Sequence, residues 1–185
     1  MKIRAAQRQR AVVDWVEANG GFVQYAGQFS GYGIGSPPEK SEWLISMFGY
    51  DFVDTISVID LSDSEITDIG PLAQLGQLRH IDLSNTKISD IMPLKQIKNL
   101  SIIILSATPI TDITPLSNTK ELLFLDISDT QVSDLSPLSD IQFIGFLTFS
   151  NTPVTDILPL LKMEELHYVE LSFLKIGKSG IEKSN

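Results

Sequence analysis

The feature that most constrains this chain of 185 residues is a five-residue motif, Asp-(Ile/Leu)-x-Pro-Leu, that returns every 22 residues. Its aspartates are Asp68, Asp90, Asp112, Asp134 and Asp156, its prolines are Pro71, Pro93, Pro115, Pro137 and Pro159, and its leucines are Leu72, Leu94, Leu116, Leu138 and Leu160. Five consecutive copies in the same phase make chance a poor explanation. A fixed period of this length predicts a solenoid, in which each repeat packs on its neighbours.

Each period also carries apolar residues with the spacing L-x-x-L-x-L, as in Leu78, Ile81 and Leu83. This spacing within a period of about 20–29 residues predicts leucine-rich repeats with one strand each. The strands are expected to begin near Ile59, Ile81, Ile103, Leu125, Leu147 and Val169. The predicted fold is an α/β solenoid of about six turns, with a parallel β-sheet on its concave face and an α-helical N-terminal cap.

The segment before the repeats predicts that cap, which a solenoid needs because its first repeat otherwise exposes an apolar edge. A helix is expected over residues 4–18, a short strand over 22–25, a Gly- and Pro-rich loop over 26–38 and a second helix over 39–49. The apolar stripe of the first helix is Ala5, Val12, Val13, Trp15 and Val16. The expected boundaries are 1–54 for the cap, 55–173 for the repeats and 174–185 for a polar tail.

Three stretches carry a family resemblance: "LSNTKISDIMPL" (83–94), "ISDTQVSDLSPL" (127–138) and "FSNTPVTDILPL" (149–160). They resemble the 22-residue bacterial leucine-rich repeats of the internalin class, over roughly residues 56–172. The N-terminal segment departs from the small helical cap of that class. The resemblance implies a binding scaffold and indicates nothing about the ligand.

The polar residues that recur in every repeat are predicted to hold the backbone. Hydroxyls can bond to backbone groups of the turn after each strand, at Ser64, Thr86, Thr108, Thr130 and Thr152. The motif aspartate is expected to cap a short helical turn, with the proline in its first turn. A metal ladder is the alternative, but Ca²⁺ takes about six to eight clustered oxygen ligands and each turn offers one carboxylate. We therefore predict no metal and no cofactor.

Positions between the core residues face the concave side, because strand side chains alternate. One outward column reads Val58, His80, Ile102, Phe124, Phe146 and Tyr168, and the next reads Asp60, Asp82, Ile104, Asp126, Thr148 and Glu170. A third column is uniform, Ser62, Ser84, Ser106, Ser128, Ser150 and Ser172, and is predicted to be structural. A flanking column reads Ser57, Arg79, Ser101, Leu123, Gly145 and His167.

The variable columns predict a partner-binding surface, since an exposed apolar patch with a polar rim marks interaction sites and aromatic residues dominate their energetics. Its anchors are Phe124, Phe146 and Tyr168; its supporting apolar residues are Ile102, Ile104 and Leu123; its polar members are His80, Asp82, Asp126 and Glu170. The carboxylates would steer a basic partner. Two alternatives stay open: packing of these side chains on one another, and self-association through the same surface.

Composition excludes several classes of function. There are no cysteines, so disulfides and thiolate metal sites are excluded. The net charge of −9 argues against nucleic acid and anionic membranes and favours either solubility or a basic partner. No apolar run is long enough to span a membrane, and the start "MKIRAAQRQRAVVDW" lacks the apolar core of a signal peptide. A cytoplasmic protein is expected as written, or a cell-surface protein if an upstream segment exists.

No catalytic constellation can be assembled. His80 and His167 lie four repeats apart, and no G-x-S-x-G elbow is present. The glycine-rich stretch "GQFSGYGIGS" (27–36) matches no phosphate-binding motif, and its Phe29 and Tyr32 are candidates only for a secondary contact. The sequence predicts a non-catalytic protein–protein interaction module, monomeric or weakly dimeric. A surface-associated internalin-like adhesin and the recognition domain of a larger enzyme are the alternatives.

Overall fold

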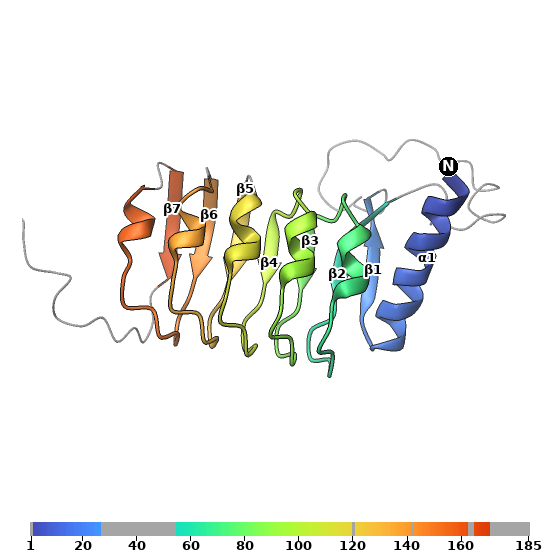
Figure 1. The fold of residues 1–185 in the computed structure, drawn as a ribbon, viewed down its shortest axis with the longest axis horizontal. Helices are drawn as coiled ribbons and strands as arrows, with labels where there is room; N and C mark the ends of the chain where they lie inside the picture. Colours follow the sequence, from blue (N-terminus) through green and yellow to red (C-terminus); the bar gives the residue numbers. More distant parts are fainter. Residues whose placement is uncertain (1, 27–54, 120, 142, 163–164, 171–185) are drawn as a thin grey trace, which may run out of the picture.

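The chain forms an elongated solenoid with one long helix at its N-terminal end (Figure 1). The structure, a computed structural model, describes residues 2–26, 55–119, 121–141, 143–162 and 165–170. The second helix of the expected cap, its Gly-rich loop with Phe29 and Tyr32, and the polar tail lie outside these residues.

The strands form one sheet in which their spatial order is their order along the chain. The strands are β1 (Phe22–Tyr25), β2 (Ile56–Asp60), β3 (His80–Asp82), β4 (Ile102–Ile104), β5 (Glu121–Asp126), β6 (Phe143–Thr148) and β7 (Glu165–Glu170). β1 runs antiparallel to β2, and every later pair is parallel. The predicted leucine-rich repeat sheet with one strand per repeat is confirmed.

Four strands begin earlier than expected. β3 and β4 start within one residue of the predicted positions, whereas β2 begins at Ile56 and β5, β6 and β7 begin at residues 121, 143 and 165. The extra residues pair in register, as Glu121 does with Phe143 and Leu122 with Ile144. The prediction missed them because it started each strand at its central core residue.

A continuous core fills the space between the sheet and the outer turns. Leu78, Ile81 and Leu83 have no exposed surface, as predicted. The threonine after each strand closes the core: the Thr86 hydroxyl donates to the Leu83 carbonyl at 2.8 Å. The same bond to the residue three positions earlier is made by Ser64, Thr108, Thr130 and Thr152. The structural role predicted for this column is confirmed.

The motif aspartates lie two residues before short 3₁₀ helices on the side opposite the sheet, and in the first four of these the Ile or Leu that follows the aspartate is the N-cap residue. These helices are η2 (Gly70–Gln74), η3 (Met92–Gln96), η4 (Thr114–Asn118), η5 (Ser136–Leu138) and η6 (Leu158–Lys162). In each repeat the aspartate Oδ1 accepts the amide N–H two residues on, at 2.8 Å between Asp90 and Met92. These bonds confirm the capping role.

Two of these capping aspartates show the electrostatic effect of their hydrogen bonds. The hydroxyl and amide of Thr114 lower the pKa of Asp112 below its ordinary value. The amide and hydroxyl of Ser136 do the same to the pKa of Asp134. Both shifts favour the ionised carboxylate, as expected where N–H and O–H groups donate to it.

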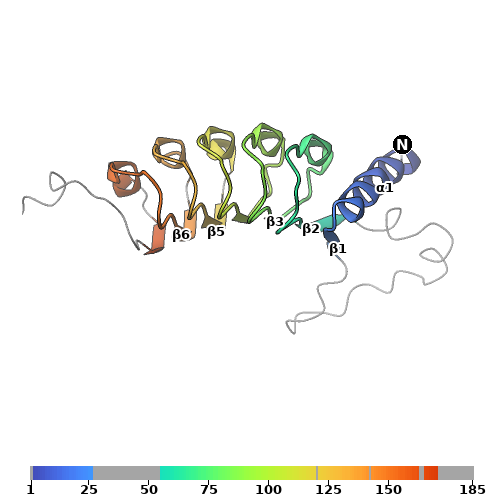
Figure 2. The ribbon, with the colours of Figure 1, turned by 90° about the horizontal axis from the view of Figure 1, so that it is seen from below.

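The outer turns spread apart while the strands stay close, so the solenoid curves with the sheet on its inner side (Figure 2). Hydrogen bonds between adjacent strands fix their spacing at about 4.8 Å. The 3₁₀ helices are bulkier than the strands, and the chain bends to accommodate them. The concave sheet face is therefore a continuous surface that crosses all repeats.

The N-terminal helix α1 (Lys2–Ala18) covers the first repeat, as the cap prediction requires. Val12, Val13 and Val16 are buried in the common core and Trp15 packs against it, but Ala5 is exposed, so its place in the buried stripe was wrong. Ala5 lies early in the helix, where less of the repeat is beneath it. The helix ends before Gly20, whose φ of +80° suits glycine.

Strands β2 to β6 are each followed, three residues on, by a residue in the left-handed conformation. These residues are Asp63, Asn85, Ala107, Asp129 and Asn151, with φ between 54° and 58°. Asn85 and Asn151 each donate a side-chain N–H to the aspartate of the preceding repeat, at 2.6 Å. Asp and Asn tolerate this conformation better than other non-glycine residues, so the strand exits form a second structural ladder beside the threonines.

Candidate functional site

The concave face carries two parallel rows of side chains, set by the register of the strands. Pairing places His80, Ile102, Phe124, Phe146 and Tyr168 opposite one another on successive strands. We call Ile102, Phe124, Phe146 and Tyr168 the apolar row. The same register aligns Asp60, Asp82, Ile104, Asp126, Thr148 and Glu170. We call its carboxylates, Asp60, Asp82, Asp126 and Glu170, the acidic row.

Exposure in the apolar row rises toward β7. Ile102 and Phe124 are half-buried, whereas Phe146 is 51% exposed and Tyr168 is 53% exposed. The rings of Phe146 and Tyr168 contact each other, with centroids 5.5 Å apart and planes tilted by 48°. This contact orders two large apolar groups side by side while leaving half of each surface in solvent.

Leu123 enlarges this apolar surface because of an irregularity in the strand. Leu122 and Leu125 both point into the core, so Leu123 and Phe124 between them both lie on the concave side. Their amides donate to one carbonyl, that of Ser101. On the next strand Gly145 makes room, since a Cβ there would lie 2.7 Å from the Leu123 carbonyl oxygen. Leu123 is consequently 53% exposed.

The acidic row is tied to the serine column. Asp82 Oδ1 accepts both the amide of Ser84 at 2.9 Å and its hydroxyl at 2.6 Å. Asp60 makes the same pair of bonds with Ser62. Asp126 accepts the amide of Ser128 and the hydroxyl of Thr148. Each of these bonds uses Oδ1, so these three carboxylates are held in a defined orientation on the concave face.

His80 lies half-buried on β3, near the N-terminal end of the concave face and beside the acidic row. Burial lowers its pKa below the ordinary value of 6.5, against the opposing effect of the Asp82 and Asp60 carboxylates. The imidazole is therefore neutral at pH 7 and does not cancel the charge of the aspartates.

The structure adds one residue that the sequence prediction missed. Phe22 on β1 pairs with Asp60 and is 56% exposed, so it extends the concave surface beyond the first repeat. The alternation in "FVQY" contained the signal, since Val23 packs against the core. Val58 and Ser57, expected in the outward columns, are instead buried, and the Ser57 hydroxyl donates to the Gln24 carbonyl of β1.

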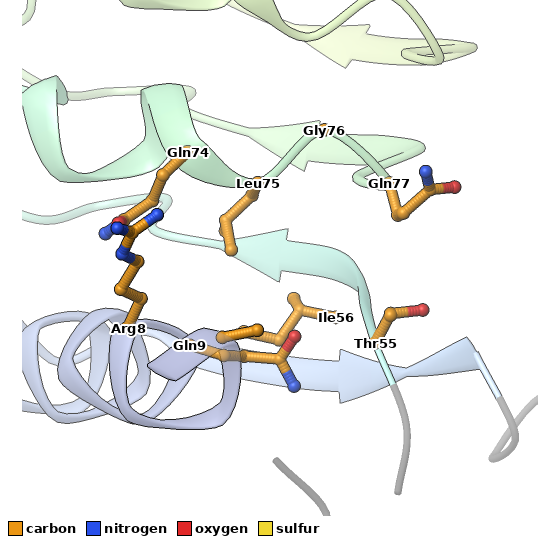
Figure 3. A pocket seen from close by; sticks show the side chains of 9 residues that line it. Arg8, Gln9, Thr55, Ile56, Gln74, Leu75, Gly76 and Gln77 are labelled. Carbon is orange, nitrogen blue, oxygen red and sulfur yellow. The ribbon is translucent and has the colours of Figure 1, made fainter. Parts of the chain in front are cut away.

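A separate cavity of about 200 Å³ lies between α1 and the first repeat (Figure 3). Its lining comprises Ala5, Arg8, Gln9, Thr55, Ile56, Gln74, Leu75, Gly76 and Gln77. Figure 3 shows Arg8 extending from the helix toward the turn that carries Gln74. This lining contains no carboxylate and no histidine, so it offers no acid–base pair.

Within the residues that the structure describes, no group of three His, Asp or Glu side chains is placed to hold a metal ion. The helices of that same part of the chain are also too short or too polar to cross a membrane. The motif aspartates lie one repeat apart, each bonded to its own turn. The concave face thus remains the main candidate surface.

No family model and no curated protein matches the sequence. Solved structures do: internalin InlF from Listeria monocytogenes is 32% identical, with a TM-score of 0.56, over 58% of this chain and 32% of that one. Internalin C2 from the same organism is 28% identical, with a TM-score of 0.59, over 75% of this chain and 59% of that one. The chain therefore spans about a third and three fifths of these two proteins.

The leucine-rich repeat ectodomain of the receptor kinase SOBIR1 from Arabidopsis thaliana has a TM-score of 0.64 over 92% of this chain and 94% of its own. At 14% identity it bears on the fold alone. Fold and repeat pattern together define a leucine-rich repeat protein. More narrowly, its repeats are similar to those of the bacterial internalins.

Proposed function

We propose that this chain is a non-catalytic protein-interaction module that binds a protein partner on its concave face. The observation that carries the proposal is the pair of contacting, half-exposed rings of Phe146 and Tyr168 on that face. Solenoids present extended concave surfaces of this kind for binding.

The energetics of the surface support this function. Covering one aromatic side chain fully contributes about 1.5–3 kcal/mol, from which the costs of association are deducted. Phe146, Tyr168 and Leu123 each keep about half of their surface in solvent. Because the two rings already pack on each other, binding of a partner would cost little side-chain entropy at Phe146 and Tyr168.

Lateral packing, the main alternative, accounts for only part of the row. Phe124 and Ile102 are half-buried by their neighbours on the sheet, so packing explains much of their presence. It does not explain why Phe146 and Tyr168 are half exposed. Large apolar side chains that stay in solvent side by side mark interaction sites.

The test compares captured partners. The wild type and the variant Phe124→Ala/Phe146→Ala/Tyr168→Ala would each be immobilised and exposed to lysate of the source cell, with circular dichroism confirming that both are folded. A protein retained by the wild type and lost by the variant supports the concave site. Equal capture by both, or none by either, would assign the rings to packing.

The likeness to internalins supports a second form of the proposal, in which the chain is the recognition segment of a surface-associated adhesin. Immunodetection in fractionated source cells separates the two forms. Detection in the envelope fraction supports the adhesin, and detection in the soluble fraction alone excludes it.

A further inference from the structure

We propose that the concave face takes a basic amphipathic helix lying along the solenoid axis, with its apolar stripe on the apolar row and its Lys/Arg flank on the acidic row. This inference rests on the proposed function and names the chemistry of the partner at that surface. Three observations carry it: the spacing of the rows, their separation and their charge.

The spacing of the apolar row matches a helix. Its four side chains sit on successive strands, β4 to β7, and neighbouring strands lie about 4.8 Å apart. A helix advances about 5.4 Å per turn, so residues three or four positions apart meet consecutive strands. An extended peptide repeats its side chains about every 6.6–6.8 Å and falls out of step after two strands.

The separation of the rows matches the width of a helix. Members of the two rows are two residues apart on the same strand, as Phe124 and Asp126 are, which places them about 6.6 Å apart. A helix with its side chains is about 10–12 Å across and covers both rows at once. Five strand spacings separate Asp60 on β2 from Glu170 on β7, about 24 Å, which a helix of about 16 residues spans.

The charge of the surface selects a basic flank. Asp60, Asp82, Asp126 and Glu170 lie on one side of the apolar row, and the exposed side chain of Arg79 lies in the flanking column on its other side. A helix whose Lys and Arg side chains lie on this side would place them against these four carboxylates. His80, neutral at pH 7, adds no opposing charge.

The probes are three synthetic peptides of 17 residues. The first carries Leu and Trp at helical spacing with Lys along one flank. The second is identical except that Glu replaces each Lys. The third has the composition of the first in an order that breaks the apolar stripe. Binding to the chain is measured by fluorescence anisotropy at low and at physiological salt.

Two triple variants locate the peptide. Asp60→Asn/Asp82→Asn/Asp126→Asn removes charge from the acidic row while keeping an oxygen to accept the serine amides. Asp68→Asn/Asp90→Asn/Asp156→Asn makes the same charge change on the outer turns and serves as the matched control. Phe146→Ala/Tyr168→Ala tests the apolar row.

The first peptide is expected to bind at least tenfold more tightly than the other two. Its affinity should fall about tenfold in the concave aspartate variant, with a weaker salt dependence, and in the ring variant, while the outer variant stays within about twofold of the wild type. Equal binding of the three peptides, equal effects of the two aspartate variants, or no binding of the first peptide would overturn the inference.

The outcome is distinguishable from that of the proposed function. If the first peptide does not bind but the capture experiment loses a protein in Phe124→Ala/Phe146→Ala/Tyr168→Ala, the concave face binds a partner of another shape. If the peptide fails and capture does not depend on the rings, both proposals are wrong.

Discussion

Aspartates occupy two faces of this solenoid and make the same local bond on both. On the outer face, the Oδ1 of Asp90 accepts the amide of Met92, and on the concave face the Oδ1 of Asp82 accepts that of Ser84. The difference is in repetition. All five outer turns keep the aspartate. On the concave face, the positions aligned with Asp60, Asp82 and Asp126 are occupied by Ile104, Thr148 and Glu170 in the other repeats.

The repeat that contains Ile104 shows what the concave aspartates contribute. Its strand β4 has the length of β3, and its exit residue Ala107 has the same left-handed φ, 55°, as its counterparts. The backbone therefore follows the same path with no carboxylate at this position. The outer aspartates belong to the framework, and the concave ones are free to be selected for another property.

The comparison between framework and concave face is sharpest for two phenylalanines three residues apart. Phe149 has no exposed surface, whereas Phe146 is 51% exposed. Phe149→Ala should lower the free energy of unfolding by about 3–5 kcal/mol, since it leaves a cavity in the core. Phe146→Ala should cost about 1 kcal/mol, because it loses mainly the ring contact with Tyr168.

Urea denaturation followed by circular dichroism measures both changes. Phe149→Leu is the matched control, which keeps the core apolar and should lose less than Phe149→Ala. Equal destabilisation by the two alanine substitutions would mean that Phe146 is a framework residue, and the proposed surface would lose its main anchor.

The two aspartate positions provide the next contrast. Asp90→Ala removes the acceptor of the first amide of η3, that of Met92, and should cost about 1 kcal/mol of unfolding free energy. Asp82→Ala should cost about half of that or less, since the Ile104 repeat keeps its backbone without a carboxylate. Urea midpoints at pH 7 measure the difference. If Asp82→Ala costs as much as Asp90→Ala, the acidic row is structural and the basic partner loses its support.

The repeat period was sufficient to predict the fold, because each framework residue recurs in every turn. Thr86 and Asp90 have local partners, three and two residues away, so a single sequence reveals their roles. The concave surface was predicted less completely. Phe22 joins it only through antiparallel pairing with β2, a contact across a segment of more than 30 residues that carries no repeat signal. Val58 also pairs with β1 and is buried, although the alternation of strand side chains placed it in the first outward column.

The smallest expected effect is a pH dependence from His80, which lies where framework and concave face meet. Burial lowers its pKa in the folded chain, so between pH 6.5 and that lower value the unfolded chain binds more protons. The stability that neutral His80 contributes is thus present above pH 6.5 and is lost as pH falls through the folded pKa. His80→Gln should remove this part of the decline in unfolding free energy, measured as the difference between the two proteins in urea midpoints across pH 5–8.

NMR titration of His80 adds a directional check: Asp82→Asn should lower its pKa further, because the Asp82 carboxylate favours the protonated imidazole. A parallel pH dependence in wild type and His80→Gln would show that the imidazole is not buried enough to matter.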